Sequence, residues 1–150
     1  MKQIKQQLFA YCQEQVNSRI ARIKAEILHA REAANEDSKS SAGDKYETGT
    51  AMMHLEQEKN QGVLNEALIL QKTLGNINPQ KTYQSAQLGS LVITSMGAFY
   101  ISVSLGKTVL DGQSYFLVSA ASPIGKALLG QVAGASVAFN GKTVEVEAVY

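Results

Sequence analysis

The amino-acid sequence predicts an α+β protein: an antiparallel coiled-coil helical hairpin followed by an antiparallel β-domain with one short helix. Two observations support this division. Residues 2–35 and 46–74 carry apolar side chains at spacings of three and four, as amphipathic helices do. Residues 87–150 instead contain short β-rich runs separated by glycine turns. We therefore expect a hairpin over residues 1–76, a linker over 77–86 and a β-domain over 87–150.

The first helix is expected to present a single apolar stripe of roughly heptad period. Polar side chains fill its other faces, so the stripe must be buried against one partner. The second helix carries a matching stripe, and a short connection makes two such helices antiparallel neighbours. At roughly 1.5 Å per residue the hairpin would be about 50 Å long. The stripe consists of Ile4, Leu8, Tyr11, Ile20, Ile23, Ile27 and Ala30, facing Met53, Val63, Ala67, Leu70 and Leu74, with Leu55, Leu64 and Leu68 beside it.

The two helices are joined by residues 35–44, which are predicted to form a loop because small and hydroxyl-bearing residues precede Gly43. Asp44 and Glu47 have the spacing of a capping box, so helix capping alone explains both residues. A functional acidic tip is the other interpretation, and both stay open. We place this tip at about residues 36–47; its acidic residues are Glu36, Asp37, Asp44 and Glu47.

The second half of the chain is expected to form an antiparallel sheet. Asp111-Gly112 and Asn140-Gly141 predict tight hairpin turns. One segment differs, because Ser122 suits a helix N-cap, Pro123 the first helical position and Gly130 the C-terminal stop. This segment is predicted to be a short helix lying across the sheet. The β-rich runs are residues 90–94, 98–103, 115–118, 136–139 and 143–149.

Composition excludes several classes of protein. The net charge is +1 at pH 7, so no global field favours nucleic acid or membranes. Arg19, Arg22 and Lys24 make part of the first helix basic; they are candidates for contact with RNA or a protein partner, although a solvated face also explains them. Cys12 is the single cysteine, which fits a reducing compartment. The first residues lack the apolar region of a signal peptide, so we expect a cytoplasmic protein without membrane association.

A cysteine nucleophile is a further possibility, because Cys12, His29 and His54 could suggest an acyl-transfer enzyme. Residues 12 and 29 would lie about 25 Å apart along one helix, so they cannot share a proton. Three dispersed residues also lack the spacing of zinc ligands. We therefore expect no independent active site and no metal bound in isolation.

Two stretches resemble the bacterial Gre-type transcript-cleavage factors, the GreA/GreB family. The segment 122–130, Ser-Pro-Ile-Gly-Lys-Ala-Leu-Leu-Gly, is similar to part of their C-terminal domain. Residues 43–47, Gly-Asp-Lys-Tyr-Glu, are similar to the family's tip pattern of Gly-Asp, two residues and Glu. The order and lengths of the predicted elements also resemble the family over nearly the whole chain.

This resemblance implies an FKBP-like C-terminal domain and a transcription elongation factor that binds RNA polymerase through its secondary channel. The tip residues Asp44 and Glu47 would help to hold a Mg²⁺ shared with the polymerase, which then cleaves its own backtracked transcript. Glu36 and Asp37 are the alternative tip acids. No cofactor would be bound in isolation, nascent RNA would be an indirect partner, and a monomer is expected. The resemblance also implies a polymerase-docking segment made of Ser122, Pro123, Ile124, Gly125 and Lys126.

Three alternatives stay open. The family's tip continues into Asn-Ala-Glu-Tyr, whereas Glu47 is followed by Thr48-Gly49-Thr50-Ala51, which favours a non-cleaving Gre-like regulator or inhibitor of the polymerase. An FKBP-like fold could also host a prolyl isomerase, although a fold alone does not carry an activity. The last alternative is a protein-interaction module unrelated to transcription.

Overall fold

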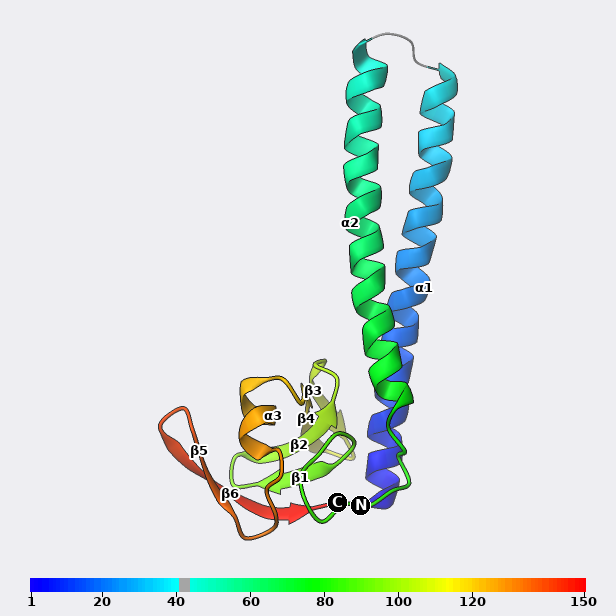
Figure 1. Ribbon diagram of the computed structural model, residues 1–150. Helices are drawn as coiled ribbons and strands as arrows, with labels where there is room; N and C mark the ends of the chain where they lie inside the picture. The colour runs from blue at the N-terminus through cyan, green and yellow to red at the C-terminus, as the bar shows by residue number, and fades with distance from the viewer. Residues whose placement is uncertain (41–43) are drawn as a thin grey trace. The chain divides into compact units, whose positions relative to one another are not determined.

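A computed structural model describes the backbone of residues 1–40 and 44–150 and the side chains of residues 1–36 and 49–150 (Figure 1). Within these ranges, two long helices precede six strands and one short helix, which confirms the predicted α+β class. The chain divides into two compact units. Residues 14–71 form the helical unit, and residues 1–13 together with 72–150 form the sheet unit. The predicted domain boundaries at 76 and 86 stay a prediction.

The two long helices are α1 (Lys2–Ser40) and α2 (Asp44–Gly75). The prediction of a loop over residues 35–44 is therefore wrong for 35–40, which continue α1. Arg, Glu and Ala at 31–34 are strong helix formers, and adding residues to an existing helix needs no new nucleus. Helix α2 ends at Gly75, within one residue of the predicted end at 74, and begins two residues before the predicted start at 46.

Within the helical unit, α1 and α2 run antiparallel and side by side (Figure 1). The amide of Gln71 donates a hydrogen bond to the Asn17 side-chain oxygen at 3.1 Å. Further along, Ala33 and Gly49 line the same groove, so the residue numbers rise on one helix as they fall on the other. The described buried residues of this unit follow the heptad seam; they are Val16, Ile20, Ile23, Leu64 and Ala67.

The seam on α2 differs from the prediction at one position, whereas the predicted Ala67 and Leu74 are buried as expected. Val63, which was expected in the stripe, is 40% exposed, whereas its neighbour Leu64 is only 8% exposed. Counting back from Ala67 in steps of three and four reaches Leu64 and then Asn60, so a polar residue occupies the next seam position. Because Asn60 is polar, the apolar pattern alone favours Val63 over the true seam position.

The sheet has the strand order β3-β4-β2-β1-β6-β5. All described neighbouring pairs are antiparallel except β2 and β4, which are parallel because β3 reverses the chain between them. The predicted antiparallel arrangement is thus confirmed apart from this one pair. Both Gly turns have positive φ at both residues, 50° and 77° at Asp111-Gly112 and 51° and 73° at Asn140-Gly141, as type I′ hairpins require. The strands are β1 (Leu91–Thr94), β2 (Gly97–Ser102), β3 (Gly106–Leu110), β4 (Gln113–Ser119), β5 (Ser136–Phe139) and β6 (Lys142–Val149).

Strand β2 is buried on both faces of the sheet. Phe99 and Ile101 belong to a core cluster with Ile124 and Leu128 of the short helix α3 (Pro123–Leu128). The alternate residues point to the opposite face, where Cys12 of α1 lies 3.7 Å (Sγ to Oγ) from Ser102. The first residues of α1 therefore cover the face of the sheet that α3 leaves open.

Residues 77–86, the predicted linker, are packed within the sheet unit. Ile77 and Ala86 are 7% and 1% exposed. Lys5 of α1 is fully buried and donates a hydrogen bond to the carbonyl of Lys81, and its ammonium lies 4.8 Å from the centre of the Tyr83 ring. This segment therefore contributes to the core of the unit. None of the helices, in the parts that the structure describes, is both long and apolar enough to cross a membrane.

Candidate functional site

The candidate acidic tip lies where the chain passes from α1 to α2, at the end of the helical unit opposite the contact between Asn17 and Gln71. Asp44 is the first residue of α2 and Glu47 follows within its first turn. The side chains of Asp37, Asp44 and Glu47 lie outside the described residues, and so does the predicted capping interaction. Glu36 is exposed in the last turns of α1. The roles assigned to these four acids stay predictions.

No three His, Cys, Asp or Glu side chains come together as a possible metal site among the residues whose side chains are described. Cys12 is buried against Ser102, and burial raises the pKa of its thiol. An activated nucleophile needs the opposite change, because the thiolate is the reactive form. Cys12 also belongs to the sheet unit, whereas His29 and His54 belong to the helical unit. The acyl-transfer interpretation gains no support.

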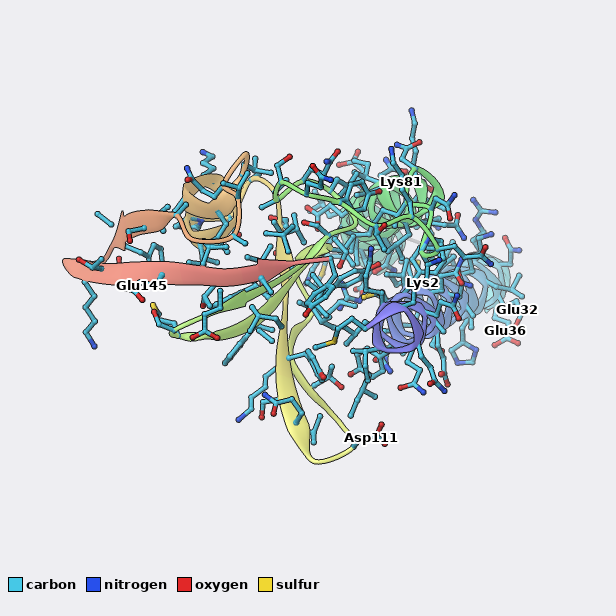
Figure 2. All side chains as sticks on the ribbon, turned by 90° about the horizontal axis from the view of Figure 1, so that it is seen from below. Lys2, Glu32, Glu36, Lys81, Asp111 and Glu145 are labelled. Atoms are coloured by element: carbon cyan, nitrogen blue, oxygen red, sulfur yellow. The ribbon has the colours of Figure 1, made fainter. Side chains whose placement is uncertain are left out.

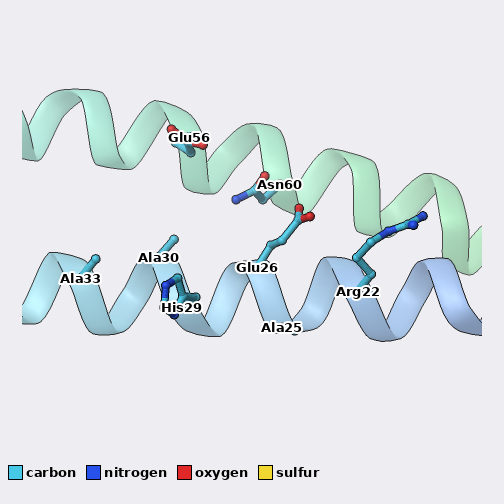
Figure 3. A pocket seen from close by; sticks show the side chains of 8 residues that line it. All are labelled: Arg22, Ala25, Glu26, His29, Ala30, Ala33, Glu56 and Asn60. Carbon is cyan, nitrogen blue, oxygen red and sulfur yellow. The ribbon is translucent and has the colours of Figure 1, made fainter.

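A groove of about 600 Å³ runs along one side of the α1–α2 pair (Figure 3). Arg22 and Glu26 extend from α1 toward α2, and Asn60 extends back from α2 (Figure 3). His29 and Glu56 complete the polar lining, while the remaining lining residues are alanines. The groove thus combines one guanidinium, two carboxylates, an imidazole and an amide over a small-residue floor, so it can both donate and accept hydrogen bonds.

A second groove of about 400 Å³ adjoins the first and shares Ala30, Ala33 and Glu56 with it. We call the two together the distal grooves. Met52 lines the second groove and is 66% exposed, and Leu55 beside it is 67% exposed. Large apolar side chains exposed next to each other are typical of a surface that a partner covers.

The distal grooves lie where small or polar side chains occupy most seam positions, although Met53 also lines the second groove. Ala30 contributes only a methyl group from α1, and Gln57 and Asn60 occupy seam positions on α2. All three are partly exposed, whereas Ile20, nearer the start of α1, is buried at 6%. These residues interrupt the apolar heptad pattern in the sequence. This interruption could have indicated a groove between the helices, but no groove was predicted.

The three basic candidates on α1 differ in their positions. Arg22 lines the larger groove. Arg19 is half-buried and lies one turn before Arg22, so the two share a face of the helix, whereas Lys24 is exposed and lies off that face. The structure therefore associates Arg22 directly, and Arg19 by its position, with the grooved side of the pair. Glu26, Glu56 and Asn60 are groove residues that the sequence did not indicate as candidates, whereas His29 was considered only as part of an acyl-transfer site.

The predicted docking segment forms α3 and its N-cap, and most of its residues have structural roles. The Ser122 hydroxyl accepts a hydrogen bond from the Gly125 amide at 3.1 Å and donates one to the Ser119 carbonyl at 2.7 Å. A Cβ atom on Gly125 would lie 2.0 Å from that carbonyl oxygen, so only glycine fits. Ile124 is 8% exposed and belongs to the core cluster.

Pro123 and Lys126 are the two exposed residues of the predicted docking segment. Pro123 occupies the first turn of α3, where its missing N–H costs no hydrogen bond. Lys126 lies in the last turn, where the helix dipole favours a positively charged side chain. Any contact with a partner through the side chains of this segment therefore depends mainly on these two residues.

Three phenylalanines that a prolyl-isomerase pocket could use are instead packed in or against the core of the sheet unit. Phe99 and Phe116 stack with ring centres 5.3 Å apart and an interplanar angle of 25°. Phe116 and Phe139 pack against the core cluster that contains Ile124 and Leu128. These rings stabilise α3 on the sheet and so do not favour an isomerase.

The fold is of the α+β class. Within the described residues it consists of a long antiparallel helical pair and a six-stranded, mostly antiparallel sheet. The chain is similar to the solved structure of GreA factor homolog 1 (Gfh1) from Thermus thermophilus, with 20% identity, coverage of 92% of this chain and 94% of that chain, and a TM-score of 0.37. It is also similar to a structure described as the transcription factor Gfh1, with 22% identity, coverage of 92% of each chain and a TM-score of 0.36. No family model and no curated protein matches the sequence. Identities and TM-scores this low do not establish a function for this chain.

Proposed function

We propose that this protein is a Gre-like transcription elongation factor that binds RNA polymerase through the secondary channel. The observation that carries the proposal is the α1–α2 pair, two helices of 39 and 32 residues with the acidic segment at their turn. Residues 14–40 alone span about 40 Å at the standard rise, and two packed helices are roughly 20 Å wide. Such a pair can enter a channel that a globular domain cannot.

The proposed chemistry belongs to the tip. Asp44 and Glu47 supply carboxylate oxygens, the ligands that Mg²⁺ prefers, and the polymerase supplies the remaining ligands. A second metal ion at the polymerase active centre can activate water and stabilise the leaving oxygen of a backtracked transcript. The protein has no independent active site in this proposal. The resemblance of residues 43–47 to the Gre tip pattern supports this choice over Glu36 and Asp37.

The distal grooves are proposed to contact the wall of the channel. Met52 and Leu55 are exposed there, beside the charged side chains of Glu56 and Lys59. An apolar patch with charged groups beside it suits a partner surface that excludes water at its centre and stays polar at its rim. The sheet unit is proposed to dock outside the channel through Pro123 and Lys126, and the factor is proposed to act as a cytoplasmic monomer.

A transcript-cleavage assay on a stalled, backtracked elongation complex tests the proposal. The double variant Asp44→Asn, Glu47→Gln keeps the size of both side chains but removes their charge. The rate of stimulated cleavage should fall on the order of a hundredfold, the usual effect of removing a group that stabilises developing charge. Binding to the polymerase should change little, because the grooves and the sheet unit are intact.

Two controls accompany this variant. Glu36→Gln with Asp37→Asn tests the alternative acids, and Glu58→Gln removes an exposed charge from α2 away from the tip. Full stimulation is expected from both. If the Asp44/Glu47 double variant cleaves as well as the wild type, the catalytic assignment is wrong; if the Glu36/Asp37 variant alone fails, the assignment moves to those residues.

The second candidate function is a non-cleaving regulator of the same channel. It is favoured by the sequence after Glu47, where Thr48-Gly49-Thr50 replaces the family's continuation and Gly49 costs the helix about 1 kcal/mol relative to Ala. A wild-type protein that binds the polymerase and slows elongation without stimulating cleavage would establish this function. Failure to bind the polymerase would leave only the unrelated interaction module.

A further inference from the structure

The sheet unit contains a pocket of about 490 Å³ that the proposed function does not use. It lies at the beginning of α1, between the β1–β2 turn and the β3–β4 hairpin. Its apolar lining consists of Met1, Ile93, Ala98, Leu110 and Tyr115, of which Ala98 and Tyr115 are only 3% and 4% exposed and Met1 is 49% exposed. A mainly apolar pocket of this size with a few polar groups is typical of ligand sites.

Asp111 supplies the main polar feature of this pocket. It lies at the turn of the β3–β4 hairpin (Figure 2), where a φ of 50° fixes its backbone in the type I′ conformation. No other lining side chain is a carboxylate or a basic group. The hydroxyl of Thr94 is already used, since it donates to the Gly97 carbonyl at 2.9 Å and accepts from the Met96 amide at 3.1 Å.

We propose that this pocket binds the side chain of an arginine or lysine presented by a partner protein. The aliphatic stem would lie along Ile93, Ala98 and Leu110, as long basic side chains bury their stems while their charged ends stay in water. The cationic end would meet the exposed carboxylate of Asp111, with the Gln113 amide oxygen as a second acceptor. An acidic or wholly apolar side chain would use only part of this lining. The proposal is independent of the tip and of the polymerase channel.

The test is an NMR titration of the full-length, ¹⁵N-labelled protein with three small probes. Nα-acetyl-arginine amide carries both stem and charge, Nα-acetyl-norleucine amide carries the stem alone, and Nα-acetyl-glutamate amide reverses the charge. Saturable shifts of the amides around Ala98, Leu110 and Tyr115 are expected, with the arginine probe binding most tightly and the glutamate probe most weakly. Added salt should weaken binding of the arginine probe, leave the norleucine probe unchanged and, by screening repulsion from Asp111, not weaken the glutamate probe.

The matched variant is Asp111→Asn. It creates an Asn-Gly turn, the same pair that forms the other type I′ hairpin at Asn140-Gly141, so the fold is retained. Affinity for the arginine probe should fall about threefold to fivefold, the upper range for an exposed ion pair, while affinity for the norleucine probe stays unchanged. Asn140→Asp makes the reciprocal change at the other turn and should alter neither affinity.

Three results would overturn the proposal. The first is the absence of saturable shifts at the highest soluble concentration of the arginine probe. The second is equal affinity for the arginine and norleucine probes, and the third is an Asp111→Asn variant that binds the arginine probe as tightly as the wild type. None of these results bears on the transcript-cleavage assay, so the two proposals fail separately.

Discussion

Replacing Gly125 by alanine is the most severe single-methyl change that the structure identifies. The new Cβ would lie 2.0 Å from the Ser119 carbonyl oxygen and 2.9 Å from the Ser122 hydroxyl oxygen. Both atoms belong to the N-cap of α3, so the clash cannot be relieved by rotating one flexible side chain. Overpacking costs about 1–3 kcal/mol, and loss of the cap adds about 1 kcal/mol. We expect the free energy of unfolding to fall by about 2–4 kcal/mol.

Urea unfolding of the sheet unit measures this loss. Near-UV circular dichroism follows the packing of buried Tyr100 and Tyr115, which both belong to the sheet unit. The Gly125→Ala midpoint should fall, and thermal unfolding should occur several degrees lower, at about 2–4 °C per kcal/mol for a chain of this size. Gly62→Ala is the matched control, because a Cβ at Gly62 meets nothing within 4 Å. It should stabilise α2 by up to about 1 kcal/mol.

The comparison refutes the reasoning if Gly125→Ala unfolds within about 0.5 kcal/mol of the wild type, the range of ordinary surface substitutions. In that case the close approach of Gly125 to Ser119 would not exist in solution. Equal destabilisation by Gly62→Ala would instead mean that any methyl group added to a helix has this effect.

Three further predictions concern the sheet unit. Ser122→Ala should lower the free energy of unfolding by about 1 kcal/mol through loss of the N-cap, measured by urea denaturation, and an unchanged midpoint would contradict the capping role. Burial, with a smaller effect of Lys2, lowers the pKa of Lys5 below the usual 10.5; the buried ammonium therefore costs stability below the folded-state pKa, and the contribution of Lys5 to stability should rise as the pH passes from that value toward 10.5. Burial raises the pKa of Cys12 and of Tyr100, and these two groups contribute a fall of stability in the alkaline range. The difference in urea midpoint between the wild type and Lys5→Met should therefore change with pH in favour of the wild type, and a difference that stays constant with pH would rule out a titrating Lys5. Cys12 should react with a thiol reagent orders of magnitude more slowly in the native protein than in urea, because it is fully buried and its thiol pKa is raised; rapid native labelling would show that α1 does not stay on the sheet.

Local chemistry allowed much of the fold to be predicted from sequence. Asn140-Gly141 predicted a type I′ turn because both residues tolerate positive φ, and both adopt it. Ser122 and Pro123 predicted the start of α3 for equally local reasons. Strand β3 was missed because Gly106, Lys107 and Thr108 carry little apolar signal, and as an edge strand it needs little.

The remaining features depend on contacts between distant residues. The proximity of Cys12 to Ser102 joins positions 90 residues apart, and no periodicity predicts such a pair. The parallel pairing of β2 with β4 has the same origin, because it depends on where β3 lies. The same holds for the candidate site. Arg22 could be predicted as a candidate from its charge, but the groove beside it could not, because Glu56 and Asn60 of α2 form its other wall.

Helix α1 has residues in both compact units, and this has a consequence for the order in which the chain folds. The helical pair is made of neighbouring segments, so it can form early, while the chain is still being synthesised. Cys12 of α1 is made 90 residues before its partner Ser102. Until Ser102 has been synthesised, Cys12 therefore lacks this contact and stays accessible to water. We expect chaperones to bind this stretch of α1 in the nascent chain before the sheet forms.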